Sequence, residues 1–266
     1  MLDCTAANGI NIHYRLSGPK DAPLIVFSNS LGTDFRIWSA VEEIIVPHMR
    51  CLFYDSRGHG LTDCPPGPYT IIDEVGDLSA LIDALHLDPT ILCGLSVGGV
   101  IAQAFAAAHP GRIEGLVLCD TAAKVLDAET WTGRMKIIEN GGIEAVADAT
   151  MERWFTERFR AEEPERLAGM RNMLNRTPKD GYLATCAVLR DTDLRESSAK
   201  LDLPTLCLCG DEDGSTTPDV VRATADLIPH ATFHLIEGAG HIPCVEQPEV
   251  TAGHILAFAR EHNLMS

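Results

Sequence analysis

The sequence lacks a long apolar run, an excess of positive charge and any internal repeat, and these absences exclude several classes of protein. No stretch of the 266 residues approaches the apolar length that spans a bilayer, so we expect no membrane-spanning segment. Lys and Arg number 21 against 38 Asp and Glu, and the formal net charge of −17 argues against binding to nucleic acid or to an anionic membrane surface. The chain is long enough for one large α/β domain with an insertion, or for two small domains.

A paired set of cysteines is also missing. The nine cysteines are an odd number, and most lie in apolar, strand-like runs, as Cys51, Cys93 and Cys119 do. This is typical of reduced thiols in a protein core and not of a disulfide framework. Cys207 and Cys209 have no Cys or His pair nearby, so we expect no zinc and no other metal. The first residues show no secretory signal, and we therefore expect a cytoplasmic protein.

What the sequence does contain is an alternation of short apolar runs with segments of helical periodicity. This alternation is typical of a mostly parallel central sheet flanked by helices, which is the α/β class. Asn8-Gly9 is a hairpin signal between the first two predicted strands. The predicted strands are 2–5, 10–16, 24–28, 51–54, 90–93, 116–119, 203–209 and 232–236, and the main predicted helices are 71–85, 100–109, 218–228 and 247–262.

The alternation is interrupted once, between residues 124 and 196, where apolar residues keep helical spacing throughout. We therefore predict a core formed by residues 1–123 and 197–266 and an inserted helical cap formed by residues 124–196. The cap holds 12 of the 21 Lys and Arg residues but only 14 of the 38 Asp and Glu residues. It is thus near neutral in an otherwise acidic protein.

The alternation centres on Ser96, within Gly94-Leu95-Ser96-Val97-Gly98. A Gly-X-Ser-X-Gly pentapeptide also occurs by chance, but here an apolar run precedes it and an alanine-rich helical stretch follows it. That is the layout of a nucleophile elbow, which exposes a serine on a strained turn between a strand and a helix. Glycines at 94 and 98 allow the strand and the helix to approach closely.

A serine nucleophile needs a base and a carboxylate that orients the base. Catalytic groups of open α/β sheets lie beyond the carboxyl ends of the strands, so only polar residues just after predicted strands qualify. His241, in a glycine-flanked loop after the last strand, is the best candidate for the base, ahead of His59, whose turn (55–60) we expect to be structural. The candidates for the acid are Asp55, Asp120, Asp211 and Asp213.

The same layout predicts an oxyanion hole. One backbone N–H should come from Val97, the residue after the nucleophile, and the other from the loop after strand 24–28. Leu31 is the best placed residue of that loop, because its neighbours Ser30 and Gly32 are small.

These motifs resemble the α/β-hydrolase superfamily, and within it the chain resembles the 3-oxoadipate enol-lactonases of the β-ketoadipate pathway. The superfamily motifs are Gly-Leu-Ser-Val-Gly-Gly around Ser96, Asp-Ser-Arg-Gly-His-Gly at 55–60, and Gly-Ala-Gly-His at 238–241. The resemblance to the enol-lactonases extends essentially from end to end, through segments 28–34, 67–70, 120–123, 152–156, 177–178 with 181–182, and 193–195. It favours Asp213 as the acid, since Asp-Gly-Ser-Thr at 213–216 matches the family's Asp-X-X-Thr.

The resemblance implies hydrolysis of a five-membered enol-lactone that carries an acetate arm, giving 3-oxoadipate in protocatechuate and catechol catabolism. His241 would take the proton of Ser96, and an acyl-enzyme would form and be hydrolysed without a cofactor. The partner would be a small anionic lactone, and an acidic protein needs a local cation to bind it. Arg134 lies three residues after Trp131, so the two share a helix face and could line a pocket, together with Trp154.

Two other interpretations stay open at this point. Another esterase, lipase or carbon–carbon-bond hydrolase of the same fold would share the catalytic residues and differ in the cap. A non-catalytic receptor for a small ligand could also use this fold. A haloalkane dehalogenase is excluded, because its nucleophile is Asp and this chain has Ser96.

Overall fold

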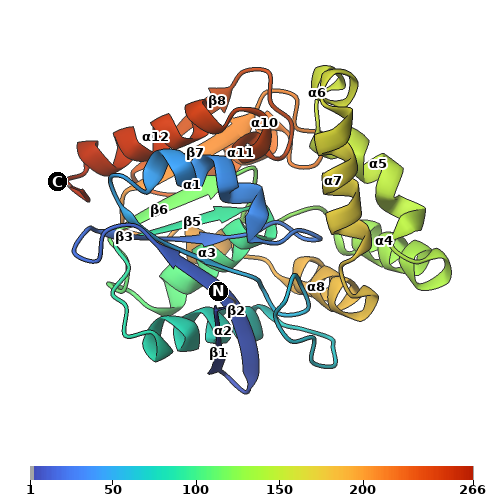
Figure 1. The fold of residues 1–266 in the computed structure, drawn as a ribbon, viewed down its shortest axis with the longest axis horizontal. Helices are drawn as coiled ribbons and strands as arrows, with labels where there is room; N and C mark the ends of the chain where they lie inside the picture. Colours follow the sequence, from blue (N-terminus) through green and yellow to red (C-terminus); the bar gives the residue numbers. More distant parts are fainter. Residues whose placement is uncertain (1–2, 266) are drawn as a thin grey trace.

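The computed structural model describes residues 3–265, so residues 1, 2 and 266 of the predicted core lie outside it. Within that range, eight strands form one central sheet in the order β1-β2-β4-β3-β5-β6-β7-β8 (Figure 1). The pairs β1–β2 and β2–β4 are antiparallel and all others are parallel, which confirms the predicted fold class. The strands are β1 (Asp3–Ala7), β2 (Ile10–Ser17), β3 (Leu24–Ser28), β4 (Arg50–Tyr54), β5 (Ile91–Leu95), β6 (Gly115–Cys119), β7 (Thr205–Gly210) and β8 (Ala231–Ile236).

The central strands are continuous apolar runs because helices cover both of their faces. Every residue of β3, β5, β6 and β7 is buried, whereas β8, at the edge of the sheet, has half-buried and exposed residues and buries only its last one, Ile236. At the other edge, the hairpin of β1 and β2 turns through Asn8 and Gly9, whose φ angles of 49° and 80° suit the predicted type I′ turn.

Helices lie on both faces of the sheet (Figure 1). On one face, α1 (Ser39–Ile45) packs against α12 (Pro248–Glu261), and on the other, α2 (Ile71–Ala84) packs against α3 (Val97–Ala108). Helix α10 (Pro218–Leu227) packs on β7 and β8. The short helices η1 (Phe35–Trp38) and α11 (Pro243–Glu246) complete the core. Of the helices that the structure describes, none combines the length and the apolar character that crossing a bilayer requires.

Between β6 and β7 the chain forms a group of helices at one end of the sheet (Figure 1). We call α4 to α8 the cap: α4 (Ala128–Gly141), α5 (Glu144–Trp154), α6 (Glu157–Glu162), α7 (Pro164–Asn175) and α8 (Lys179–Asp191). The two crossings between core and cap lie side by side, because the Leu194 N–H donates to the Ala123 carbonyl at 2.8 Å. Helix α9 (Arg195–Ser198) contains residue 196, the predicted end of the insertion, and packs against α3 of the core.

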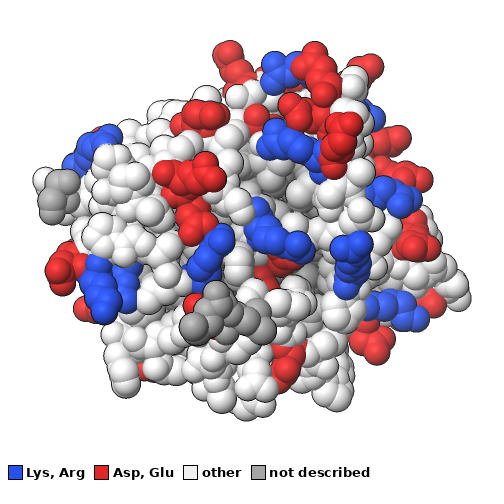
Figure 2. Space-filling view, viewed as in Figure 1, with Lys and Arg blue, Asp and Glu red and all other residues white. Residues whose placement is uncertain are grey.

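Charge is unevenly distributed over the surface. Figure 2 shows Asp and Glu side chains scattered over the visible face, and Lys and Arg side chains around a hollow between the core and the cap. An acidic protein thus presents local positive charge near the boundary of its cap.

Candidate active site

Ser96 lies on the turn between β5 and α3, in a conformation that few side-chain-bearing residues adopt. Its φ and ψ angles are 55° and −118°. A Cβ on Gly94 would overlap the carbonyl of Gly98, and a Cβ on Gly98 would overlap the carbonyl of Ser28 in β3. Both glycines are therefore sterically required, and the strained serine is held by its fold rather than by local preference. The Thr121 hydroxyl supports the turn by donating to the Ser96 carbonyl at 2.6 Å.

His241 and Asp213 form a buried pair. His241 Nδ1 lies 2.9 Å from Asp213 Oδ2, and the two residues are 2% and 3% exposed. Asp213 Oδ1 accepts the N–H groups of Ser215 (2.6 Å) and Thr216 (3.1 Å), and Oδ2 also accepts the Thr216 hydroxyl (2.8 Å). Burial opposes ionisation of Asp213, but the charge of His241 and these hydrogen bonds hold the pKa of the carboxyl below its usual value.

Within the described chain, none of the other acid candidates pairs with His241. Asp55 is 2.7 Å from His13 and supports the loop that follows β4. Asp211 is exposed and accepts the N–H of Ala239. Asp120 is buried next to Asp213 and is considered again below. The structure therefore pairs His241 with Asp213, the residue that the Asp-X-X-Thr match favours.

Ser96 and His241 border one pocket of about 570 Å³ between the core and the cap. The predicted residues Leu31, Trp131, Arg134 and Trp154 line it as well. The pocket thus combines loops at the carboxyl ends of the strands with helices α4 and α5 of the cap. In open α/β sheets ligands bind at these carboxyl ends of the strands.

Val97 begins α3 directly after Ser96, and Leu31 lies in the loop that follows β3. Across residues 3–265, neither the Leu31 nor the Val97 N–H donates to a protein acceptor, so both amides are available to an oxyanion. The Leu31 loop is braced by His59, whose Nε2 accepts the Gly32 N–H at 3.0 Å. The loop at 55–60 therefore contributes support, as expected.

Two arginines of the cap reach this pocket, and the sequence pattern predicted only one of them. Arg134 Nη2 donates to the Thr150 hydroxyl (3.1 Å) and to the Tyr182 hydroxyl (2.6 Å), and its guanidinium carbon lies 5.7 Å from the Trp131 ring centroid. Arg153 Nη2 donates to the same Thr150 hydroxyl at 3.1 Å. Arg153 precedes the predicted Trp154, and neighbours in a helix face different directions, so helical spacing did not place it in the pocket, although it lies in segment 152–156 of the resemblance.

Neither arginine forms an ion pair with a carboxylate of the described chain, and Arg134 Nε is buried without a hydrogen-bond acceptor there. Burial and the charge of Arg134 lower the pKa of Arg153, only partly offset by Tyr182 and Glu152. Burial raises the pKa of Tyr182 to about 12, so its hydroxyl remains a neutral acceptor for Arg134. Two neighbouring guanidinium groups without an acid create a site for an anion.

The end of α5 is fastened to the loops that carry Asp213 and His241. The Arg153 carbonyl accepts the Gly214 N–H (3.3 Å), and the Trp154 carbonyl accepts the His241 N–H (2.9 Å). Glu246 adds two further hydrogen bonds, since its Oε1 accepts the Thr156 hydroxyl (2.7 Å) and its Oε2 accepts the Gly240 N–H (2.6 Å). We call these four hydrogen bonds the latch. The cap is therefore fixed to the loops of Asp213 and His241 by hydrogen bonds of 2.6–3.3 Å.

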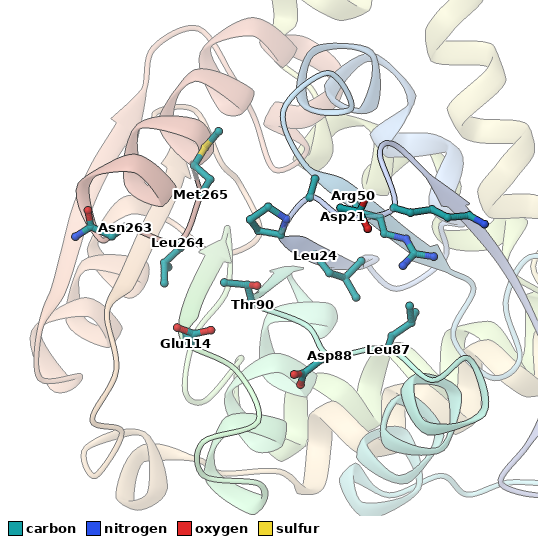
Figure 3. A pocket seen from close by; sticks show the side chains of 13 residues that line it. Asp21, Leu24, Arg50, Leu87, Asp88, Thr90, Glu114, Asn263, Leu264 and Met265 are labelled. Atoms are coloured by element: carbon teal, nitrogen blue, oxygen red, sulfur yellow. The ribbon is translucent and has the colours of Figure 1, made fainter.

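A second hollow, of about 610 Å³, lies at the opposite ends of the strands (Figure 3). Leu24, Arg50, Thr90 and Glu114 line it, and they stand at or just before the beginnings of β3, β4, β5 and β6. It is formed at the amino ends of the strands, remote from Ser96, and its lining carries charges of both signs. We therefore place the active site in the pocket beneath the cap.

Comparison with known proteins agrees with this fold. A family model described as the alpha/beta hydrolase fold matches residues 23–248. The chain belongs to the α/β-hydrolase family. This α/β hydrolase is 32% identical to 3-oxoadipate enol-lactonase 2 of Acinetobacter baylyi, over 98% of this chain and 97% of that protein.

Solved structures give the same result. The enol-lactonase from Burkholderia xenovorans LB400 superimposes with a TM-score of 0.94 at 37% identity, over 97% of this chain and 100% of that one. A thermophilic esterase from Thermogutta terrifontis, solved with malate bound, has a TM-score of 0.90 at 29% identity, over 98% and 97% of the two chains. The resemblance predicted from the motifs is confirmed.

Proposed function

We propose that this α/β hydrolase is a carboxylic ester hydrolase that opens 3-oxoadipate enol-lactone to 3-oxoadipate. The observation that carries the proposal is that Arg134 and Arg153 have no acidic partner in the described chain, although they line the pocket that also holds Ser96 and His241. Arg134 Nε is moreover buried there without a hydrogen-bond acceptor. This arrangement suits a substrate that joins a reactive ester to a carboxylate. The similarity to enol-lactonases over nearly the whole chain supports it.

In the proposed mechanism, His241 Nε2 takes the proton from Ser96 Oγ as that oxygen attacks the lactone carbonyl. Asp213 accepts the Nδ1–H of His241 and stabilises the imidazolium that forms. The N–H groups of Leu31 and Val97 stabilise the oxyanion, and an acyl-enzyme forms when the ring C–O bond breaks. The leaving oxygen is an enolate, which takes a proton and becomes a ketone. His241 then activates water to release the acid, and no step uses a metal or an organic cofactor.

The cap residues would select the substrate. Arg134 and Arg153 would bind the carboxylate of the acetate arm by charge-assisted hydrogen bonds, and Trp131 and Trp154 would form apolar walls beside the ring. This role follows the predicted division into a core (1–123 and 197–266) that carries the chemistry and a cap (124–196) that covers it.

We place the reaction in the catabolism of protocatechuate and catechol, where the resemblance puts it, and in the cytoplasm. Seven of the nine free cysteines are buried thiols, which suits a reducing compartment.

The test is steady-state hydrolysis of 3-oxoadipate enol-lactone beside a neutral p-nitrophenyl ester, by the wild-type protein and by Ser96→Ala. Ser215→Ala is the matched control, because Ser215 also lines the pocket but bonds Asp213 through its N–H and not through its hydroxyl. We expect rapid lactone turnover and weak ester turnover, both lost in Ser96→Ala and kept in Ser215→Ala. Full lactonase activity of Ser96→Ala would refute the mechanism.

A second candidate, another carboxylesterase of this fold, is favoured by the likeness to the malate-bound esterase. Good ester turnover without lactone turnover would support it and keep the serine mechanism. A protein whose Ser96 reacts with a fluorophosphonate probe but which turns over neither compound would instead fit the receptor interpretation.

A further inference from the structure

Asp120 is a buried acid that the proposed mechanism leaves without a role. It directly follows β6, it is 0% exposed, and its φ angle of 46° places it in the left-handed region, as Ser96 is. A carboxylate oxygen of Asp120, a carboxylate oxygen of Asp213 and the sulfur of Cys209 all lie within 4.8 Å of one another. A second carboxyl group therefore lies close behind the acid that orients His241.

The two carboxyl groups differ sharply in the donors that face them. Asp213 receives two backbone N–H groups, the Thr216 hydroxyl and His241. Asp120 Oδ1 receives one N–H, from Gly210 at 2.9 Å, and its buried Oδ2 receives none from residues 3–265. The Cys209 thiol is a weak donor, and its single proton also has the carbonyls of Gly210 (3.3 Å) and Thr216 (3.6 Å) within reach.

Two carboxylates this close and this deeply buried do not both ionise, and the one with fewer donors keeps its proton. We propose that Asp120 is protonated at neutral pH and donates its proton in a hydrogen bond to Asp213, as a positioning residue for the catalytic acid. A buried carboxylate oxygen without a donor would be costly, whereas a protonated oxygen is itself a donor and has an acceptor beside it. The inference rests on the proposed role of Asp213.

The local electrostatics agree with this assignment. Burial and the charge of Asp213 raise the pKa of Asp120 well above its usual value, and the Gly210 N–H opposes this only in part. The other ionisable groups around Asp120 are the thiols of Cys119, Cys209 and Cys244, and burial or hydrogen bonding raises the pKa of each, so they stay neutral. Asp213 and, through it, His241 are the charged groups that face Asp120.

The proton also completes the hydrogen bonding of Asp213. The Thr216 hydroxyl lies 2.7 Å from the Asp120 carbonyl and 2.8 Å from Asp213 Oδ2, but one hydroxyl proton cannot serve both acceptors fully. A proton on Asp120 supplies the additional donor. It leaves the full negative charge on Asp213, where it stabilises the imidazolium of His241.

The experiment compares the wild-type protein with Asp120→Asn, which keeps the shape and a donor, and Asp120→Ala, which removes both. Asp211→Asn is the matched control, because Asp211 is an exposed acid of the same loop as Asp213. Because the buried Glu74 carboxyl is also protonated at pH 7, the infrared comparison is a difference spectrum between each variant and the wild-type protein. We expect this difference to show the loss of a protonated-carboxyl band in Asp120→Asn and no such loss in Asp211→Asn. We also expect Asp120→Asn to keep kcat within about 3-fold and Asp120→Ala to lose about 10-fold or more in kcat with little change in KM.

The pH profile separates a neutral Asp120 from an ionised one. If Asp120 is neutral, Asp120→Asn leaves the acid limb of kcat/KM unchanged; if it is ionised, losing its charge lowers that limb by about 1–2 pH units. A shifted limb, or a difference spectrum in which Asp120→Asn loses no carboxyl band, overturns the inference. The infrared difference needs no substrate, so a protein that loses the band on Asp120→Asn but fails to open the lactone retains this inference and loses the proposed function.

Discussion

Replacing Arg153 with Met tests the anion site directly, because this residue adds a charge to the pocket that no acid balances. Its guanidinium shares the Thr150 hydroxyl with Arg134, at 3.1 Å for each, and forms no ion pair within residues 3–265. Met retains most of the apolar stem and removes the charge. We expect Arg153→Met to lose activity on the anionic lactone and to keep it on a neutral ester.

The size of the loss follows from one contact. A hydrogen bond between charged groups contributes about 1.5–3 kcal/mol, so losing it lowers kcat/KM by roughly 10- to 150-fold. Burial and the charge of Arg134 already lower the pKa of Arg153, so the substitution also relieves repulsion in the free enzyme. The net loss should therefore lie toward the lower end, at about 10- to 30-fold.

The assay measures kcat/KM for the enol-lactone and for a p-nitrophenyl ester in parallel, at low and at physiological salt. Arg176→Met is the matched control, since it removes the same charge from an exposed cap residue that borders a different hollow. Equal losses on lactone and ester would refute the reasoning. So would an Arg176→Met variant that loses as much on the lactone as Arg153→Met does.

Three further predictions concern the support of the site. Glu74 is 1% exposed, and burial raises its pKa from 4.5 to about 8, so the folded state holds a proton that the unfolded chain releases, and stability falls as pH rises through that range. The gain in unfolding free energy from Glu74→Gln over the wild-type protein, measured with urea, should therefore be larger at pH 9 than at pH 5, by up to about 5 kcal/mol. An equal gain at the two pH values would contradict this. Gly98→Ala would force a Cβ against the Ser28 carbonyl and should abolish fluorophosphonate labelling, whereas Gly253→Ala, in a helix with nothing within 4 Å, should label normally and gain about 0.5–1 kcal/mol of stability. Glu246→Gln should lower kcat more than it changes KM and speed hydrogen exchange at the end of α5; unchanged exchange would argue against the latch.

Sequence patterns predicted the core well where burial leaves a clear apolar pattern. Strand β3 matches its predicted range of 24–28, because a strand covered on both faces reads as an unbroken apolar run. Helix α3 was placed too late, at residue 100, although it begins at Val97. The glycines at 98 and 99 hid its first turn, because glycine disfavours helices except where, as here, close packing requires it.

The site was predictable where it depends on the order of elements and not where it depends on the cap. Ser96, His241 and the Leu31 loop follow from their places after strands, and the Trp131–Arg134 pair follows from helical spacing. Choosing Asp213 over Asp211 depended on the resemblance, since both follow β7 and differ only in how the loop turns. Arg153 was missed because cap helices pack by tertiary contacts that no local pattern encodes.

In the proposed mechanism, the latch links substrate selection to catalytic geometry through two residues of α5. The carbonyls of Arg153 and Trp154 accept the N–H groups of Gly214 and His241, while the side chains of the same two residues line the pocket. A change of side chain leaves the carbonyls in place, because backbone hydrogen bonds do not depend on side-chain identity. The pocket can therefore alter its specificity at these two positions without displacing the loops of Asp213 and His241. A shift of the α5 backbone, in contrast, would move the anion site and the paired acid and histidine together, so binding and turnover should fail as one.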